Sequence, residues 1–341
     1  MKRFISEDDI ERACIEVCTD NLGYKTFNCM NQDYLNRKSE REVLYEYRIK
    51  RCLKKINAHL TDRKEGLSDD EIDEAYSKLA NLDYSTDPKK LNREVMNMIR
   101  TGVEVKIKKK GGKTQKETLQ FIDWEHPESD KNDFMVVNQL WIQGDVYRLR
   151  PDVVVYVNGI PLVTIELKDS NVNVKEAYDD NLTRYKKAIP QLFAYNAFLV
   201  ASNGIHTKVG PTHASWNFFK PWLRQEDGQH LSKEFKSQVE ETGRSLDYLL
   251  LGLLDKKKLL DYVQNFIMYH KGNKICAQNH QFLGVNNAIE RFKYVMSPEV
   301  KEEDKGKMGV FWHTQGSGKS FSMVFLEAKI GRAVQQECRD R

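Results

Sequence analysis

Two apolar runs separated by Asn-Gly constrain the fold more than any other feature of this chain. The first run is VVVYV at 153–157, and the second is IPLVTI at 160–165. Val- and Ile-rich runs on either side of Asn-Gly predict a β-hairpin. Because both runs are apolar without polar alternation, we expect the hairpin to lie in a sheet that is covered on both faces.

Charged residues stand at the outer ends of this predicted hairpin. Asp152 precedes the first run, and Glu166 and Lys168 follow the second. Side chains alternate along a strand, so Glu166 and Lys168 share a face while Leu167 points away. Converging carboxylates can hold a hard divalent cation, and an adjacent ammonium can orient or deprotonate a water. This set suits a Mg²⁺-dependent phosphodiester hydrolase; the alternative is a surface hairpin with a Lys–Glu pair.

The register of the hairpin decides whether the two carboxylates meet. A strict two-residue turn at Asn158 and Gly159 pairs Val157 with Ile160 and places the acids on opposite faces. A three-residue loop that ends in a left-handed glycine with a G1 bulge pairs Tyr156 with Ile160 instead. The acids then become diagonal neighbours on one face, about 7–8 Å apart. We predict the bulged loop.

Length and composition set broad limits. A chain of 341 residues suggests about two domains. Lys and Arg number 54 against 50 Asp and Glu, an excess too small to identify a nucleic-acid partner. The densest basic run, at 106–113, predicts a hairpin tip that is solvated by default, with phosphate contact as the alternative.

The cysteines and the hydropathy indicate the compartment. The six cysteines show no C-x-x-C pair and no disulfide-framework spacing. In the absence of a signal peptide, they are typical of reduced thiols in a cytoplasmic protein. No apolar run approaches transmembrane length, so we expect no membrane partner.

The remaining periodicity predicts alternating helices and strands in a mixed α/β layer arrangement. Helices are expected after the N-cap Ser6, over 41–60, after the cap Ser68 and over 91–100. Further along, a hairpin is expected from 103 to 122, a strand at 134–142, a helix at 174–189 and a buried strand at 197–201.

A second chemical motif lies at 309–320, with the sequence GVFWHTQGSGKS. We expect a short buried strand, a Gly-rich loop and then a helix, which together turn backbone N–H groups toward a phosphate. Lys319 would reach the β/γ-phosphates and Ser320 would ligate Mg²⁺. His313 stands where the usual motif has its first glycine, and an ordinary polar loop is the alternative. The candidate nucleotide-binding residues are Thr314, Gln315, Gly316, Ser317, Gly318, Lys319 and Ser320.

The sequence ends at Arg341, soon after this loop. A P-loop ATPase needs a later acidic strand for Mg²⁺ and water, and usually a further arginine. We therefore expect a fragment or the product of a truncated gene, without ATP hydrolysis of its own.

The chain resembles the N-terminal part of the restriction (motor and nuclease) subunit of type I restriction–modification enzymes. The resemblance covers nearly everything from Glu7 to about Leu326. Its specific points are SEDDIE at 6–11, NDFMVVNQ at 132–139, RPD at 150–152, VNGIPLV at 157–163, IELK at 165–168 and WHTQGSGKS at 312–320.

The resemblance implies roles for particular residues. In that family the hairpin is the PD-(D/E)xK nuclease motif, which implies Asp152 and Glu166 as metal ligands and Lys168 as the catalytic lysine. The family places Gln-x-x-x-Tyr in the following helix, which corresponds here to Asn181 and Tyr185, an auxiliary pair toward DNA or metal-bound water.

The resemblance also implies an architecture and partners. It predicts an α/β restriction-endonuclease-like domain over 1–255, with a mixed central sheet flanked by helices. The start of a P-loop RecA-like motor domain would follow over 256–341. Gln281 matches a glutamine that reads adenine in related helicases, with a helix cap or a surface residue as the alternative.

The implied cofactors are Mg²⁺ and, in the full-length family, ATP. The implied partners are double-stranded DNA and the methylation and specificity subunits. The rival interpretation is a catalytically silent truncated subunit that docks on DNA or on the methyltransferase. A stand-alone P-loop ATPase is disfavoured because the later strands are missing.

Overall fold

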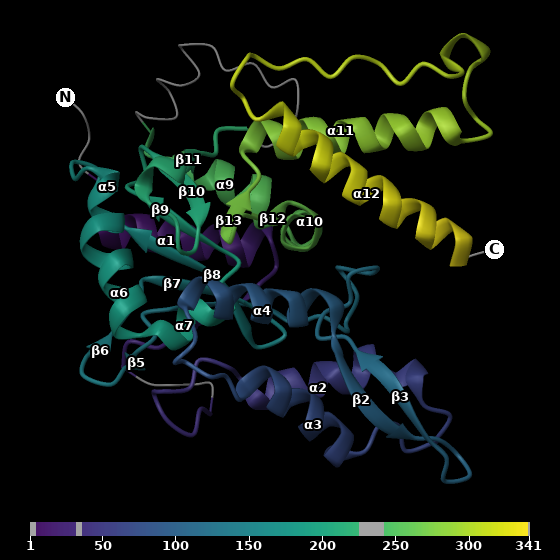
Figure 1. The fold of residues 1–341 in the computed structure, drawn as a ribbon. Coiled ribbons are helices and arrows are strands. Elements are labelled where there is room, and N and C mark those ends of the chain that lie inside the picture. The colour runs from purple at the N-terminus through teal and green to yellow at the C-terminus, as the bar shows by residue number, and fades with distance from the viewer. Residues whose placement is uncertain (1–4, 32–35, 225–241, 340–341) are drawn as a thin grey trace.

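A seven-stranded mixed sheet forms the centre of the chain in the computed structural model, which describes residues 5–31, 36–224 and 242–339 (Figure 1). Its order is β1 (Lys25–Asn28), β4 (Phe134–Asn138), β7 (Val153–Val157), β8 (Ile160–Leu167), β9 (Phe198–Ser202), β10 (Thr207–Pro211) and β11 (Lys220–Pro221). The pairs β1–β4 and β8–β9 are parallel, and the other neighbours are antiparallel. The predicted mixed α/β class is therefore confirmed.

Helices surround this sheet, and short hairpins project from it. The α-helices are α1 (Glu7–Glu16), α2 (Glu46–Ile56), α3 (Asp69–Ala80), α4 (Pro88–Thr101), α5 (Val174–Glu176), α6 (Thr183–Ala188), α7 (Pro190–Tyr195), α9 (Ser245–Leu253), α10 (Lys256–Asn265), α11 (Asn279–Met296) and α12 (Lys319–Arg339). The π-helices are η1 (Val17–Asn21) and η3 (Ala177–Leu182), and the 3₁₀-helices are η2 (Ala58–Leu60), η4 (Trp216–Phe218) and η5 (Glu302–Asp304). The hairpins are β2 (Val103–Lys108) with β3 (Thr114–Leu119), β5 (Ile142–Gln143) with β6 (Arg148–Leu149), and β12 (Ile267–His270) with β13 (Asn273–Cys276).

The predicted helix caps are present. The Ser6 side chain accepts a hydrogen bond from the Asp9 N–H, and Ser68 forms a reciprocal capping box with Glu71. The helix expected from residue 41 begins at Glu46 instead. The Tyr45 N–H donates to the Gly159 carbonyl at 3.0 Å, and this long-range bond fixes the chain in a non-helical conformation just before the helix.

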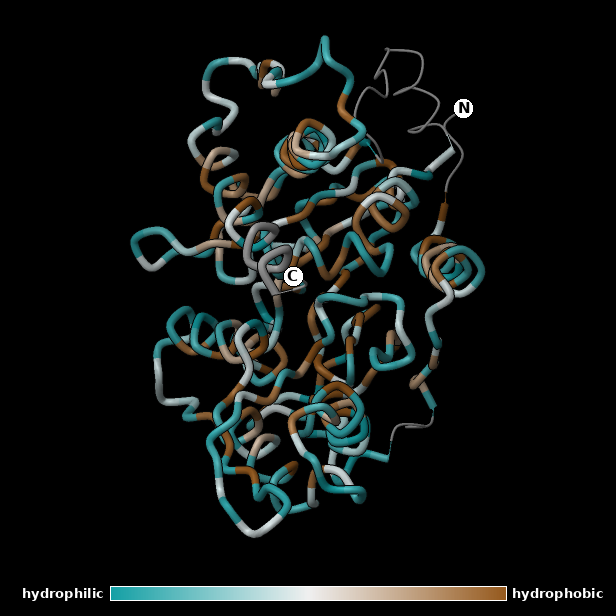
Figure 2. Tube along the Cα trace, turned by 90° about the vertical axis from the view of Figure 1, so that its right-hand side faces the viewer, coloured by the Kyte–Doolittle hydropathy of each residue, from teal (hydrophilic) through white to brown (hydrophobic). Residues whose placement is uncertain are grey.

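The core lies on both faces of the central sheet. All residues of β4, β7, β8 and β9 are buried. Figure 2 shows hydrophobic segments in the interior and hydrophilic loops at the periphery. In the part of the chain that the structure describes, no helix is both long and apolar enough to cross a membrane.

The hairpin between β7 and β8 turns differently from our prediction. Asn158 and Gly159 both have positive φ, at 53° and 85°, and Val157 pairs with Ile160. These are the features of a two-residue type I′ turn, whose twist matches that of the flanking strands. The expected three-residue loop with a G1 bulge is wrong.

A bulge nevertheless exists farther along the hairpin. Tyr156 pairs with Pro161, whereas Val155 pairs with Val163, so Leu162 is the extra residue on β8. Proline has no N–H to donate to the ladder, and prolines inside sheets are found at edges or bulges. The bulge shifts the register by one residue, so the pairs beyond it have a different alignment from the pairs at the turn.

Gly159 should be more sensitive to substitution than a left-handed glycine that lies in open space. A Cβ at Gly159 would lie 2.8 Å from the Tyr45 carbonyl oxygen. Gly66 also has positive φ, 77°, but a Cβ there has nothing within 4 Å. We expect Gly159→Ala to lower the free energy of unfolding by about 3 kcal/mol and the control Gly66→Ala by about 1 kcal/mol. Urea unfolding measures both, and equal losses would contradict the packing argument.

Candidate functional site

The register shift brings the two predicted acids together. Beyond the bulge Val153 pairs with Ile165, so the next positions outward are Asp152 and Glu166. Asp152 Oδ2 accepts a hydrogen bond from the Leu167 N–H at 2.7 Å. The two acids are thus opposite one another rather than diagonal, and their meeting results from a bulge that the sequence analysis placed elsewhere.

Glu166 is completely buried and is held by the helix after β8. Its Oε1 accepts hydrogen bonds from the Asn181 amide and, at 3.3 Å, from the Tyr185 hydroxyl. Asn181 lies in the π-helical segment η3, a form that is frequent at functional sites. The other oxygen, Oε2, is buried and has no hydrogen-bond partner among the described residues.

Lys168 lies between the two acids and α1. Its Nζ donates to the Leu167 carbonyl at 3.0 Å and lies 3.8 Å from Glu166 Oε1. It also lies 3.6 Å from Glu7 Oε2, in the first turn of α1. The Glu7 N–H donates to Asp169 Oδ1 at 2.6 Å, which ties the start of α1 to the end of β8.

Sequence reasoning missed the acids of α1. From the sequence, Glu7 and Glu11 belong only to a predicted helix start and to the stretch at 6–11 that resembles the restriction-subunit family. A cleft of about 530 Å³ has Glu7, Glu11 and Asp152 among its lining residues. Glu11 also accepts a hydrogen bond from the Asn138 amide at 2.7 Å. The signal available in the sequence was that two acids one helical turn apart share a face.

Burial changes the acidity of this cluster. It raises the pKa of Asp152 to about 7, against the hydrogen bond from the Leu167 N–H. Burial, and then the charge of Asp152, raises the pKa of Glu166 well above its usual range. The pKa of Glu7 is also raised by burial, with Lys168 opposing. Ionising both hairpin acids therefore requires more positive charge than Lys168 supplies.

The donor set fits a hard divalent cation. Asp152 and Glu166 offer carboxylate oxygens, including the unpartnered Oε2, and the Leu167 carbonyl is adjacent. The described residues contain no group of three or more His, Cys, Asp or Glu side chains suited to a metal ion. A cation here would therefore be held by two carboxylates and a backbone carbonyl.

The predicted nucleotide loop has a less regular setting. Helix α12 begins at Lys319, after the glycines, as expected. The residues before the loop do not form the predicted buried strand, because Val310 and Trp312 are 91% and 78% exposed. No strand in the described ranges pairs with 308–312, and unpaired backbone does not hold a strand. Lys319 Nζ donates to the His313 carbonyl at 3.0 Å.

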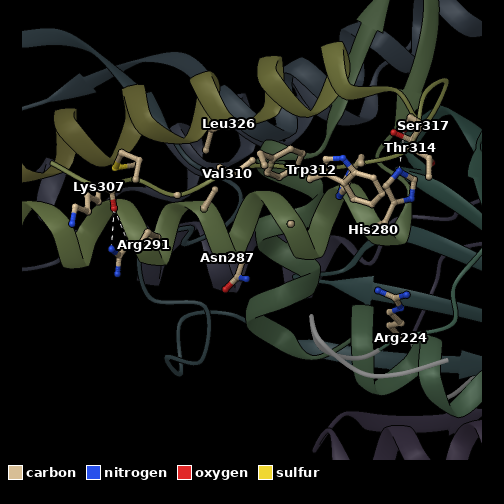
Figure 3. Close-up of a pocket in the computed structure, with 16 residues that line it drawn as sticks. Arg224, His280, Asn287, Arg291, Lys307, Val310, Trp312, Thr314, Ser317 and Leu326 are labelled. Atoms are coloured by element: carbon tan, nitrogen blue, oxygen red, sulfur yellow. Dashed lines mark hydrogen bonds between the residues drawn. The ribbon is translucent and has the colours of Figure 1, made fainter. Parts of the chain in front are cut away.

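Gln281 contacts this loop and also caps its own helix. Its Nε2 donates to the carbonyls of Ser317 at 3.3 Å and Gly318 at 3.0 Å. Its Oε1 accepts from the Gln278 N–H at 2.8 Å, so the helix-cap interpretation is confirmed, and adenine recognition stays a prediction. Figure 3 shows Val310 and Trp312 beside α11. These two residues line a cavity of about 880 Å³ together with Arg224 and His280.

Comparison with known proteins gives the family. Residues 4–218 match the model of the type I restriction enzyme R protein N terminus. The chain belongs to this family. Residues 280–339 of this R-protein chain match a second model, the SWI2/SNF2 ATPase, and they include Gln281 and the P-loop.

Two relatives are endonuclease subunits by name. A protein of Methanocaldococcus jannaschii, named as a type I restriction enzyme endonuclease subunit, is 32% identical over 340 residues, which are 94% of this chain and 31% of that protein. The HindI endonuclease subunit of Haemophilus influenzae is 34% identical over 248 residues, which are 70% of this chain and 22% of that protein. The R-protein chain thus spans about a third or less of the length of these relatives.

Proposed function

We propose that this R-protein chain carries the Mg²⁺-dependent nuclease domain that cuts double-stranded DNA in a type I restriction enzyme. The observation that carries the proposal is the buried pair Asp152 and Glu166, with one unpartnered oxygen and with Lys168 beside it. The mixed sheet with its paired acids and lysine also supports a PD-(D/E)xK fold. Asp152, Glu166 and Lys168 would be the catalytic residues.

In this mechanism each side chain has a separate task. Asp152, Glu166 and the Leu167 carbonyl would hold Mg²⁺, which supplies charge stabilisation to the phosphate and activates water. Lys168 would orient the attacking water or neutralise a phosphate oxygen. Asn181 and Tyr185 hold Oε1 of Glu166, which leaves Oε2, unpartnered among the described residues, available to a cation.

The C-terminal part would bind ATP in the longer protein. The proposed contacts are the loop residues from Thr314 to Ser320 and Gln281, supported by the hydrogen bonds of Gln281 to the loop. The relatives are named as subunits, which supports a complex of several subunits; the proposed partners in it are the methylation and specificity subunits, and the proposed location is the cytoplasm. The boundary between residues 255 and 256 remains a prediction.

A plasmid assay tests the proposed activity. Supercoiled DNA is incubated with the chain, alone and with the methylation and specificity subunits, in Mg²⁺ or in EDTA. We expect nicked or linear DNA in Mg²⁺ and intact plasmid in EDTA. Intact plasmid in every Mg²⁺ reaction would favour the silent docking subunit instead.

A further inference from the structure

Two lysines that have no acidic partner among the described residues lie beside the proposed nuclease site. Lys186 lies on α6 and Lys208 on β10. Lys220 on β11 pairs with Val209, so it projects from the other face of the sheet. Burial lowers the pKa of Lys186 to about 8, and burial together with Lys220 lowers the pKa of Lys208. No carboxylate of the described residues contributes to either shift. The positive charge of this cluster is therefore uncompensated by the described part of the protein.

Aromatic rings hold both of these ammonium groups. Lys186 Nζ lies 4.7 Å from the ring centroid of Tyr178, and Lys208 Nζ lies 4.6 Å from that of Trp216. The two rings lie 5.7 Å apart, so the contacts form one continuous series. An ammonium group over an aromatic face is attracted by the ring quadrupole while its outer side stays open to an anion.

Neighbouring residues hold the Trp216 and Tyr178 rings in place. Trp216 stacks on Phe219 with centroids 5.3 Å apart, and Phe219 is only 2% exposed. A Cβ at Gly210 would lie 2.4 Å from the Phe219 ring, so this glycine allows the close approach. The Tyr178 hydroxyl donates to the Ala214 carbonyl at 2.9 Å. The lysines thus stand on a rigid support, which lowers the entropy lost when they bind a ligand.

Sheet register places this support next to the proposed catalytic acids. Glu166 pairs with Ala201 on β9, and Ala201 pairs with Lys208 on β10. Paired residues of neighbouring strands project from the same face, and two strand spacings are about 10 Å. Tyr178 and Asn181, which contacts Glu166, also belong to the same π-helix.

We infer that Lys186 and Lys208, supported by Tyr178 and Trp216, bind the phosphate backbone of double-stranded DNA beside the bond that is cut. The inference rests on the proposed function, because that function makes duplex DNA the substrate. Each strand carries one phosphate per about 3.4 Å of helix axis, so about 10 Å spans roughly three base-pair steps. A duplex with one phosphate at the acids thus has further phosphates within reach of the lysines.

The basic hairpin β2–β3 provides a matched contrast. Two of its lysines are already neutralised, Lys109 by Glu117 at 2.8 Å and Lys116 by Glu104 at 2.6 Å. The hairpin also projects far from β10 and β11 in Figure 1. Its exposed lysines at 106 and 110 therefore serve as a control with the same change in net charge.

Fluorescence anisotropy with a labelled DNA duplex, in EDTA so that no cleavage occurs, tests the inference. We expect the double variant K186A/K208A to bind at least about 10-fold more weakly than the native chain at moderate salt. The slope of log Kd against log salt should fall by about 2, close to one per lost phosphate contact. The control double variant K106A/K110A should change affinity less than about 3-fold.

Equal losses in the two double variants, no loss in either, or no duplex binding by the native chain would overturn the inference. If K186A/K208A unfolds, as judged by circular dichroism, the single variants are compared instead. Each alanine variant should lower the salt slope by about 1, and Lys208→Arg should keep the native slope. Binding and cleavage are measured separately, so the two proposals can fail separately. If DNA affinity depends on these lysines but the plasmid is not cut, the phosphate-binding site is supported and the nuclease proposal is rejected. If the plasmid is cut but DNA affinity does not depend on these lysines, the nuclease proposal is supported and the phosphate-binding site is rejected.

Discussion

Asp152→Asn is expected to lower Mg²⁺-dependent DNA cleavage by at least about 100-fold while the chain stays folded. The amide keeps the shape of the side chain but removes the negative charge that a cation needs. Lys168→Ala should have a comparable effect, because its Nζ lies 3.8 Å from Glu166 and nothing else positive lies as close in the described residues. The plasmid assay measures both variants.

The control for this prediction is Asp180→Asn. Asp180 is the exposed neighbour of Asn181 on the same π-helix, so the exchange is chemically identical but directed to solvent. It should leave cleavage within about twofold of the native rate. Full cleavage by Asp152→Asn, with circular dichroism unchanged in every variant, would remove the hairpin acid from the mechanism.

The metal-free chain should lose stability as the pH rises from about 4 to about 7. The folded-state pKa of Asp152 is raised to about 7 from the ordinary 3.8, so the folded chain binds more protons than the unfolded chain in this window. The free energy of unfolding then falls with rising pH, by about 3 kcal/mol in total. Glu166, whose pKa is raised in the same direction, extends the loss to higher pH.

Divalent cations should reverse that loss. At pH 8, millimolar Mg²⁺ should raise the urea midpoint of the native chain, because binding to the folded state alone stabilises it. The double variant D152N/E166Q should show neither the pH-dependent loss nor the response to Mg²⁺. Ion-paired acids such as Asp133, whose pKa is lowered, change stability with the opposite sign and below pH 4. Identical pH profiles for the native and double-variant chains would refute the argument.

Local patterns predicted the elements that carry the site. The apolar runs around Asn158 and Gly159 indicated the hairpin, and Ser6 and Ser68 marked helix starts that are present. These predictions succeed because caps and tight turns depend on a few neighbouring residues.

The details that failed depend on distant parts of the chain. The bulge at Leu162 also involves the residue just before β9, since the Leu162 carbonyl accepts from the Ala197 N–H at 2.7 Å. The contact between Glu7 and Lys168 joins α1 to β8, and no local spacing encodes it. The expected strand before the P-loop is irregular because a strand needs neighbours, which the described residues do not supply at 308–312.

The central claim is that Asp152 and Glu166 share one divalent cation. Diffraction from crystals soaked in Mn²⁺, recorded for its anomalous signal, tests this claim most directly. The account predicts one strong peak about 2.2 Å from oxygens of both acids, with the Leu167 carbonyl as a further ligand. Crystals that bind Mn²⁺ elsewhere and show no peak between these two side chains would contradict it.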